Sequence, residues 1–213
     1  TWFYYLTTDW FWIFALALIT AFMIFMNFFY STLIVPLFNK QTPLEEGELR
    51  TRISEMAAKM GFELDNVFII DGSKRSSKAN AYFAGLGKKK RIVLFDTLIN
   101  DLSTDEIVAV LAHEIGHYKK GHIISGMVLS VLTSAVTLFI LSLALSEPAL
   151  SVALGASQPS FHMGLVAFGI LYSPVSSLTG LFSNWISRRN EFSADRFAAE
   201  NFSAANLGEA LKK

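Results

Sequence analysis

The chain has 213 residues, of which 52% are hydrophobic, and its 18 basic and 18 acidic side chains balance to a net charge of zero. It contains no cysteine, which excludes a disulfide framework, a thiol nucleophile and a zinc site with cysteine ligands. The hydrophobic content is high for a soluble domain. Because the chain also begins without Met and ends in a helical pattern, the sequence predicts a piece of a larger membrane protein.

Three long apolar runs cover residues 10–29, 123–145 and 161–186, in regions that contain no Lys or Arg. At about 1.5 Å per helical residue, each run is long enough to cross a hydrocarbon core of about 30 Å. We therefore predict a mainly α, multi-span α-helical membrane protein. Residues 1–37 form a transmembrane helix and its flank, and residues 123–187 form a transmembrane hairpin.

Residues 38–122 are predicted to form a catalytic segment with a small sheet. Its first element, within residues 43–62, is an amphipathic helix, which we expect to pack against the catalytic helix. The apolar face of this helix consists of Leu49, Ile53, Met56, Ala57 and Met60. Three short β-rich runs follow at 67–71, 80–84 and 91–95, with a Gly- and Lys-rich turn at 85–90 before the last. They predict a small antiparallel β-sheet.

The next element is the catalytic helix, which the spacing of apolar residues predicts to be continuous from Ser103 to His122. Ser103 and Glu106 form an S-x-x-E capping box at its start. Within it, His113, Glu114 and His117 spell H-E-x-x-H. Two histidines four residues apart share a helical face and can bind one Zn²⁺, with the glutamate beside them.

A catalytic zinc site normally has a third protein ligand. His122 is on a different face of the predicted helix, and His162 is predicted near the opposite membrane surface, so both are poor candidates. Glu191 fits better, because the returning span leads directly into residues 188–213, a helix that carries it. Asp195, one turn further on, could accept the free ring N–H of a ligand histidine. The alternative is that both carboxylates belong to an ordinary solvated helix face.

These residue types together predict hydrolysis. Zinc lowers the pKa of bound water to about 7, and Glu114 beside the metal is placed to act as the general base. The basic residues orient this site, because residues 38–122 carry 13 Lys and Arg whereas residues 146–160 carry none. By the positive-inside rule the catalytic segment is cytoplasmic. The basic turn at 88–91 has no interleaved aromatics, so we expect no nucleic-acid binding.

The sequence elements HEIGHY, EFSAD and GSKRSSKANAYFAGLGKKKRIVLFDTLI, with hydrophobic spans before and between them, resemble the integral-membrane CAAX prenyl endopeptidase family. Members of this family are zinc gluzincins that cleave after a prenylated cysteine. The resemblance runs from about residue 27 to about residue 199. It implies that one zinc ion per chain is bound by His113, His117 and Glu191, with Glu114 as the base.

The resemblance also implies that Asn80 contacts the substrate or its tetrahedral intermediate. The strand formed by Asn80, Ala81, Tyr82 and Phe83 could pair with an extended peptide by β-augmentation, which depends little on side chains. The alternative is a plain core strand. Members of the family have about seven spans and a C-terminal segment with His and Arg. This chain has three predicted spans and no such segment, which predicts a fragment that covers the C-terminal part.

The sequence is compatible with three functions. The first is removal of the C-terminal tripeptide from a prenylated protein whose lipid stays in the bilayer. The second is an HtpX-like quality-control peptidase that acts on unmodified membrane proteins. The third is a catalytically silent zinc-binding membrane scaffold, against which the intact Glu114 argues. The corresponding location is the bacterial inner membrane, or the endoplasmic reticulum membrane in a eukaryote.

Overall fold

The structure, a computed structural model, describes residues 2–7, 10–62, 64, 66–73, 80–84, 91–158 and 160–212. It is mainly helical with a small mixed sheet, and it divides into two compact units. The helical unit comprises Thr1–Ile24 and Ile124–Arg188, and the sheet unit comprises Phe25–Ile123 and Arg189–Lys213.

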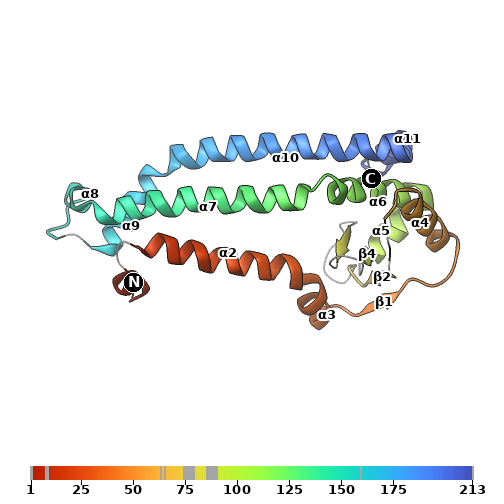
Figure 1. Ribbon diagram of the computed structural model, residues 1–213, viewed down its shortest axis with the longest axis horizontal. Coiled ribbons are helices and arrows are strands. Elements are labelled where there is room, and N and C mark those ends of the chain that lie inside the picture. The colour runs from red at the N-terminus through yellow and green to blue at the C-terminus, as the bar shows by residue number, and fades with distance from the viewer. Residues whose placement is uncertain are drawn as a thin grey trace. The chain divides into compact units, whose positions relative to one another are not determined.

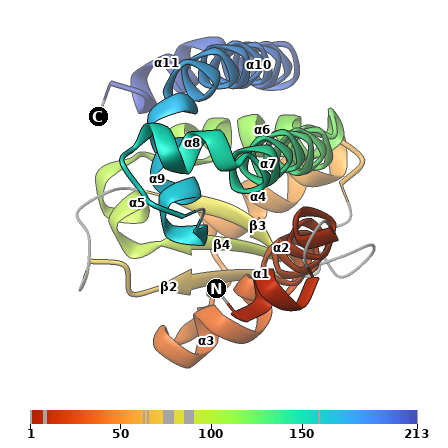
Figure 2. The same cartoon turned by 90° about the vertical axis from the view of Figure 1, so that its left-hand side faces the viewer.

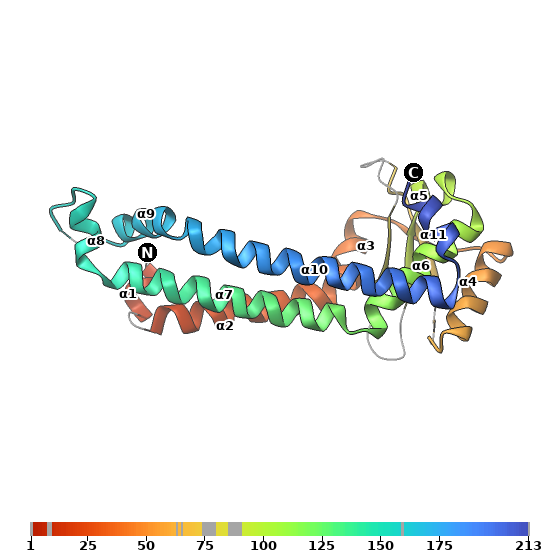
Figure 3. The same ribbon diagram turned by 90° about the horizontal axis from the view of Figure 1, so that it is seen from above.

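Within its described residues the helical unit contains helices and no strand. Helix α7 and the first part of helix α10 run side by side in two perpendicular views (Figures 1 and 3). The helices are α1 (Trp2–Thr7), the first part of α2 (Phe11–Phe29), α7 (His122–Ser146) from its third residue, α8 (Pro148–Ala153), α9 (Phe161–Leu171) and the first part of α10 (Ser173–Asn201).

Helices α2 and α7 confirm the first two predicted apolar helices, and both are long and apolar enough to cross a membrane. The third predicted run is not one straight helix, because α9 and α10 are bent by 53° at the break between them. Pro174, the second residue of α10, has no N–H to donate to the preceding turn, and its ring clashes with the carbonyl group four residues earlier, which breaks the helix. The hydroxyl of Tyr172 is hydrogen-bonded to Thr137 of α7 at the same point. The described helices thus give two candidate spans, or three if the bent pair is one span.

The sheet unit packs helices against one face of a four-stranded sheet. Helices α4 and α6 cover this face (Figure 2), and a single hydrophobic core lies between the helices and the strands. Its elements are the end of α2, a π-helical turn (Tyr30–Ile34), α3 (Val35–Phe38), β1 (Gln41–Pro43), α4 (Glu48–Lys59), β2 (Asn66–Ile70), β3 (Ala81–Ala84), β4 (Arg91–Phe95), α5 (Asp96–Asp101), α6 (Thr104–Lys119), the end of α10 and α11 (Ala204–Ala210).

The prediction of an antiparallel sheet is wrong in part, because the sheet is mixed. The strand order is β1-β2-β4-β3; β2 and β4 are parallel, and the other two pairs are antiparallel. Strand β4 takes an interior position because Ile92, Val93 and Leu94 are fully buried, which suits a strand covered on both faces. Strands β3 and β4 pair as antiparallel neighbours, and β2, on the other side of β4, runs parallel to β4. Strand β1 was not predicted; it is three residues long and ends at Pro43.

The predicted amphipathic helix is confirmed as α4, whose apolar face packs into the core against α6. The capping box is also confirmed: Glu106 N donates to Ser103 Oγ, and Ser103 N donates to the Glu106 carboxylate at 2.7 Å. The prediction that this helix continues to His122 is wrong. Helix α6 ends at Lys119, and Gly121 adopts a φ of +69°, a conformation that ends helices and that only Gly adopts without cost.

Helices α6 and α10 approach closely at Gly116. A Cβ atom at this position would lie 3.2 Å from Ala194 Cα and 3.2 Å from both Cβ and Cδ1 of Phe197. Ala194 and Ala198 of α10 are fully buried. The absence of a side chain at Gly116 therefore sets how near the backbone of α10 comes to α6.

We expect Gly116→Ala to destabilise the sheet unit, because the methyl group would press on the backbone of α10. Overpacking of this kind lowers stability by about 1–3 kcal/mol, and the higher helix propensity of Ala offsets at most about 1 kcal/mol of this loss. The matched control is Gly208→Ala in α11, where an added Cβ meets no atom within 4 Å. Thermal unfolding of the two variants should show a lower melting temperature for Gly116→Ala alone. Equal melting temperatures would contradict the close approach.

A group of hydrogen bonds fixes the backbone just after β2. The carboxylate of Asp96 accepts hydrogen bonds from Gly72 N, Ser73 N and Thr97 N, each at 2.9 Å, and from Ser73 Oγ at 2.6 Å. The hydroxyl of Ser73 and these backbone N–H groups hold the pKa of Asp96 below its ordinary value. This carboxylate therefore ties the turn after β2 to the start of α5.

A group with a lowered pKa stabilises the fold above its ordinary pKa, and this stabilisation is lost as the pH falls through the lowered value. We therefore expect Asp96→Asn to lower the melting temperature at pH 7 and to lose this effect progressively as the pH falls below 4. Melting curves of the variant and the wild type across this pH range test the expectation. Glu45→Gln, at an exposed carboxylate, is the control. A difference that stays constant with pH would exclude the ionised Asp96 as its source.

Candidate metal centre

Three side chains from two helices of the sheet unit converge at one point. His113 and His117 are one turn apart on α6, and Glu191 lies on α10. The Nε2 atoms of the two histidines are 3.0 Å apart, and Oε2 of Glu191 is 3.4 Å from His113 Nε2 and 3.5 Å from His117 Nε2. The structure thus brings together the three residues that the sequence predicted as metal ligands.

The geometry and chemistry of these three residues fit a zinc ion. Ligand atoms that share a tetrahedral zinc at the usual bond lengths are about 3.3 Å apart, close to the three distances observed here. Two imidazoles and a carboxylate are a normal zinc ligand set. In the part of the chain that the structure describes, no other group of three His or acidic side chains is arranged in this way.

The histidines must be neutral to bind a metal through Nε2. Burial lowers the pKa of His117, which favours the neutral ring at pH 7 although the nearby Glu191 acts in the opposite direction. Glu191 itself is the most open of the three, with 55% of its side chain exposed against 14% for His113 and 21% for His117. The site is therefore enclosed on the α6 side and accessible beside Glu191.

Asp195 lies where the sequence predicts it, next to one of the two histidines. Its Oδ1 atom is 2.8 Å from Nδ1 of His113, while Nε2 of the same ring faces Glu191. An acceptor at Nδ1 places the ring proton there and leaves Nε2 free to bind a metal. This is the arrangement that fixes the tautomer and the orientation of a ligand histidine.

Glu114 follows His113 on α6 and is half-buried. Burial raises the pKa of its carboxyl group, and the negative charge of Glu191 acts in the same direction, whereas His113 opposes both. A carboxyl group with a raised pKa exchanges protons more readily near neutral pH than an exposed one. Its environment therefore suits a proton-transfer role beside a metal.

One contact of the site was not predicted. His122, the first residue of α7, has its Nδ1 atom 3.0 Å from Nδ1 of His117. On the continuous helix that apolar spacing predicts, His122 would face away from His117. The sequence signal for the earlier end of α6 is Gly121 after two lysines, a common pattern at a helix C-terminus.

The predicted substrate strand is β3, which forms one edge of the sheet and packs against α6. The side chains of Ala81 and Phe83 join the helix-covered core, and that of Tyr82 lies on the opposite face of the sheet. Asn80 is exposed, and its carbonyl oxygen accepts a hydrogen bond from Phe95 N at 3.0 Å. The backbone of the strand and the exposed side chain of Asn80 are therefore available at this edge.

Two parts of the predicted sequence pattern cannot be compared with the structure. The segment 74–79, which contributes to the GSKRSS block, and the basic turn 85–90 lie outside the described residues.

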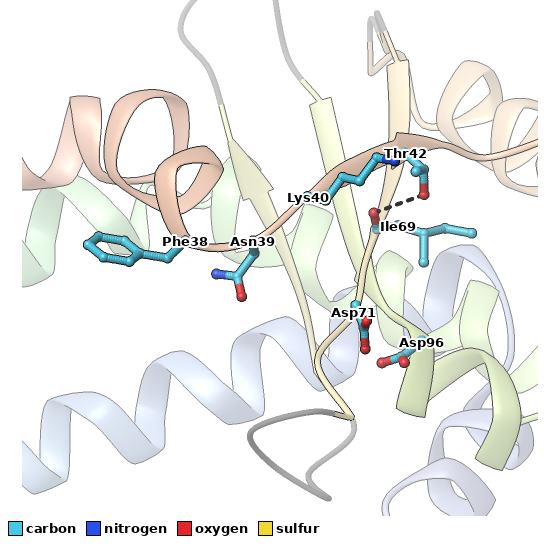
Figure 4. A pocket seen from close by; sticks show the side chains of 7 residues that line it. All are labelled: Phe38, Asn39, Lys40, Thr42, Ile69, Asp71 and Asp96. Carbon is cyan, nitrogen blue, oxygen red and sulfur yellow. Dashed lines mark hydrogen bonds between the residues drawn. The ribbon is translucent and has the colours of Figure 1, made fainter.

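The sheet unit also contains a cavity of about 320 Å³ that is separate from the metal ligands (Figure 4). It is lined by Phe38, Asn39, Lys40, Thr42, Ile69, Asp71 and Asp96. Asp96 is already engaged by the turn after β2, and the cavity contains no histidine. The cavity therefore does not extend the metal centre.

The chain is similar to known peptidases. The sequence profile of peptidase family M48 matches residues 43–213. The chain is 41% identical over 193 residues to a protein named CAAX prenyl protease 1 homolog from Dictyostelium discoideum, covering 89% of this chain and 45% of that protein. It is 42% identical over 194 residues to CAAX prenyl protease 1 of Saccharomyces cerevisiae, covering 84% of this chain and 43% of that protein.

The crystal structure of Ste24p from S. mikatae has the same fold, with a TM-score of 0.83 and 36% sequence identity. The match covers 98% of this chain and 53% of that structure. The chain thus spans about half the length of the relatives that it matches. The chain belongs to peptidase family M48.

Proposed function

We propose that this protein acts as a zinc-dependent membrane endopeptidase that removes the C-terminal tripeptide from prenylated CAAX proteins. The observation that carries the proposal is the convergence of His113, His117 and Glu191 beside Glu114. The CAAX prenyl protease names of its relatives support the choice of substrate.

His113, His117 and Glu191 would hold one zinc ion, which when bound supplies a Lewis acid that activates water and polarises the scissile carbonyl group. Glu114 then takes a proton from the attacking water and passes it to the nitrogen of the leaving amine. The hydroxyl group of the water bonds to the carbonyl carbon as the C–N bond breaks, so the products are a carboxylic acid and an amine. Asp195 keeps the ring of His113 in the tautomer that can bind the ion.

Strand β3 is where we infer that the substrate binds. It is an edge strand that packs against α6, the helix that carries two of the ligands and the base. An extended peptide that pairs with the backbone from Ala81 to Phe83 would lie beside that helix, whatever its side chains. Asn80 offers the side chain that could contact the scissile region, whereas Tyr82 takes part only through its backbone.

The apolar helices support a membrane location for this reaction. Helices α2 and α7 could hold the protein in the bilayer that also holds the lipid of a prenylated substrate. The 13 Lys and Arg residues of 38–122, against none in 146–160, support a cytoplasmic active site. No nucleic acid takes part in the proposed reaction.

The role of Glu114 is tested by Glu114→Gln, which keeps the volume of the side chain but cannot take the proton. We expect zinc content equal to that of the wild type and a fall in kcat of about 10²–10⁴-fold. Glu191→Gln is the comparison and should lose zinc as well as turnover, because an amide is a poorer zinc ligand. Zinc content is measured by atomic absorption and turnover by peptide cleavage. Full turnover in Glu114→Gln would remove this residue from the mechanism.

The substrate class is tested with the purified protein in lipid nanodiscs and three substrates: a farnesylated CAAX peptide, the same peptide without the lipid, and casein. We expect cleavage of the farnesylated peptide and at least tenfold slower cleavage of the other two, since the buried lipid contributes about 0.8 kcal/mol per CH₂ to binding. Comparable cleavage of casein would instead favour an HtpX-like quality-control peptidase. Bound zinc without any cleavage would favour a silent scaffold.

A further inference from the structure

The contact between His122 and His117 links the metal centre to a residue outside the H-E-x-x-H motif. The Nδ1 atoms of the two rings are 3.0 Å apart, and the rings meet edge to face, with centroids 5.0 Å apart and an interplanar angle of 78°. The other nitrogen of His117, Nε2, faces His113 and Glu191. Each nitrogen of His117 therefore has a different neighbour.

The hydrogen bond to His122 and the metal at Nε2 together determine which nitrogen of His117 carries the proton. Two ring nitrogens can form a hydrogen bond only if one of them carries the proton and the other does not. A neutral histidine that binds a metal through Nε2 carries its proton on Nδ1. His117 Nδ1–H is then the donor, and His122 Nδ1 is the acceptor.

The other ligand histidine has a corresponding partner. His113 Nδ1 is 2.8 Å from Asp195 Oδ1, on the side of the ring away from Glu191. Both ligand rings thus have an acceptor at Nδ1 and the same nitrogen, Nε2, directed at the third ligand. We propose that His122 is a positioning residue that fixes the tautomer and the orientation of His117, as Asp195 does for His113. This inference rests on the metal site of the proposed function.

The backbone between the two histidines is built for this contact. On a continuous helix, a residue five positions after His117 would be turned by about 140° from it. The chain instead leaves α6 through Gly121, whose N–H donates to Tyr118 O at 3.1 Å and whose φ is +69°. A Cβ atom at Gly121 would meet nothing within 4 Å, so the glycine is required for its conformation and not for space.

The first test compares His122→Asn with His122→Phe. An Asn side chain can place an amide oxygen near the position of Nδ1 and so keeps an acceptor, whereas Phe keeps a ring of similar size without one. Zinc affinity is measured on the purified protein by competition with a chromophoric chelator. We expect His122→Asn to bind zinc within about threefold of the wild type and His122→Phe to bind it about 10–100-fold more weakly. His162→Phe, at the remaining histidine of the chain, should leave the affinity unchanged.

The second test changes the turn and leaves both histidines in place. Asn tolerates a φ of +69° and Val does not, so Gly121→Asn should keep the zinc affinity and Gly121→Val should reduce it by a similar factor to His122→Phe. This pair also decides the matter if His122→Phe fails to fold.

The outcomes separate this inference from the function on which it rests. If the wild type binds no zinc, both the proposed metal site and the role of His122 are wrong. If the wild type binds zinc and His122→Phe binds it equally well, only the positioning role is wrong. Equal losses in the Asn and Phe variants would also overturn it, because they would show that the imidazole packs in place without acting as an acceptor.

Discussion

The candidate metal centre depends on how closely two helices can approach. Helix α6 carries His113 and His117, and α10 brings Glu191 to within 3.4 Å and 3.5 Å of their Nε2 atoms. Such distances are possible because Gly116, between the two histidines, has no side chain to separate α6 from Ala194. The buried Ala194 and the exposed Glu191 lie one turn apart on α10, so the contact of Ala194 with α6 also fixes the position of Glu191 beside the two histidines.

The sheet side of the unit supports this helix pair without supplying a ligand. The apolar face of α6, including Ile107, Leu111 and Ile115, is fully buried against the strands and α4. The histidines lie at the border of this core, where His113 and His117 keep only 14% and 21% exposure. The core therefore fixes the orientation of α6, and its edge supplies the low-dielectric surroundings that lower the pKa of His117 and raise the pKa of Glu114.

Local patterns in the sequence predicted most of this arrangement. The spacing of His113 and His117 fixed their common face, the pair Ser103 and Glu106 predicted the start of the helix, and the need for a third ligand pointed to Glu191. The direction of the strands could not be predicted, because it depends on which strand takes the interior position, and this is decided by burial across the whole unit. Three residues of β1 and the single proline at the α9–α10 break carry too weak a local signal.

The wrongly predicted end of α6 shows that a glycine in a helical pattern can have either of two structural roles. Gly116 and Gly121 are five residues apart in one helical pattern, yet an added Cβ would collide at the first and meet open space at the second. At Gly116 the missing side chain leaves room for the backbone of α10, and Gly116 itself keeps the φ of an α-helix. At Gly121 the missing side chain permits a φ of +69°, which ends the helix and turns His122 back towards His117. Apolar periodicity does not distinguish these two roles, so it continued the helix through the residue that ends it.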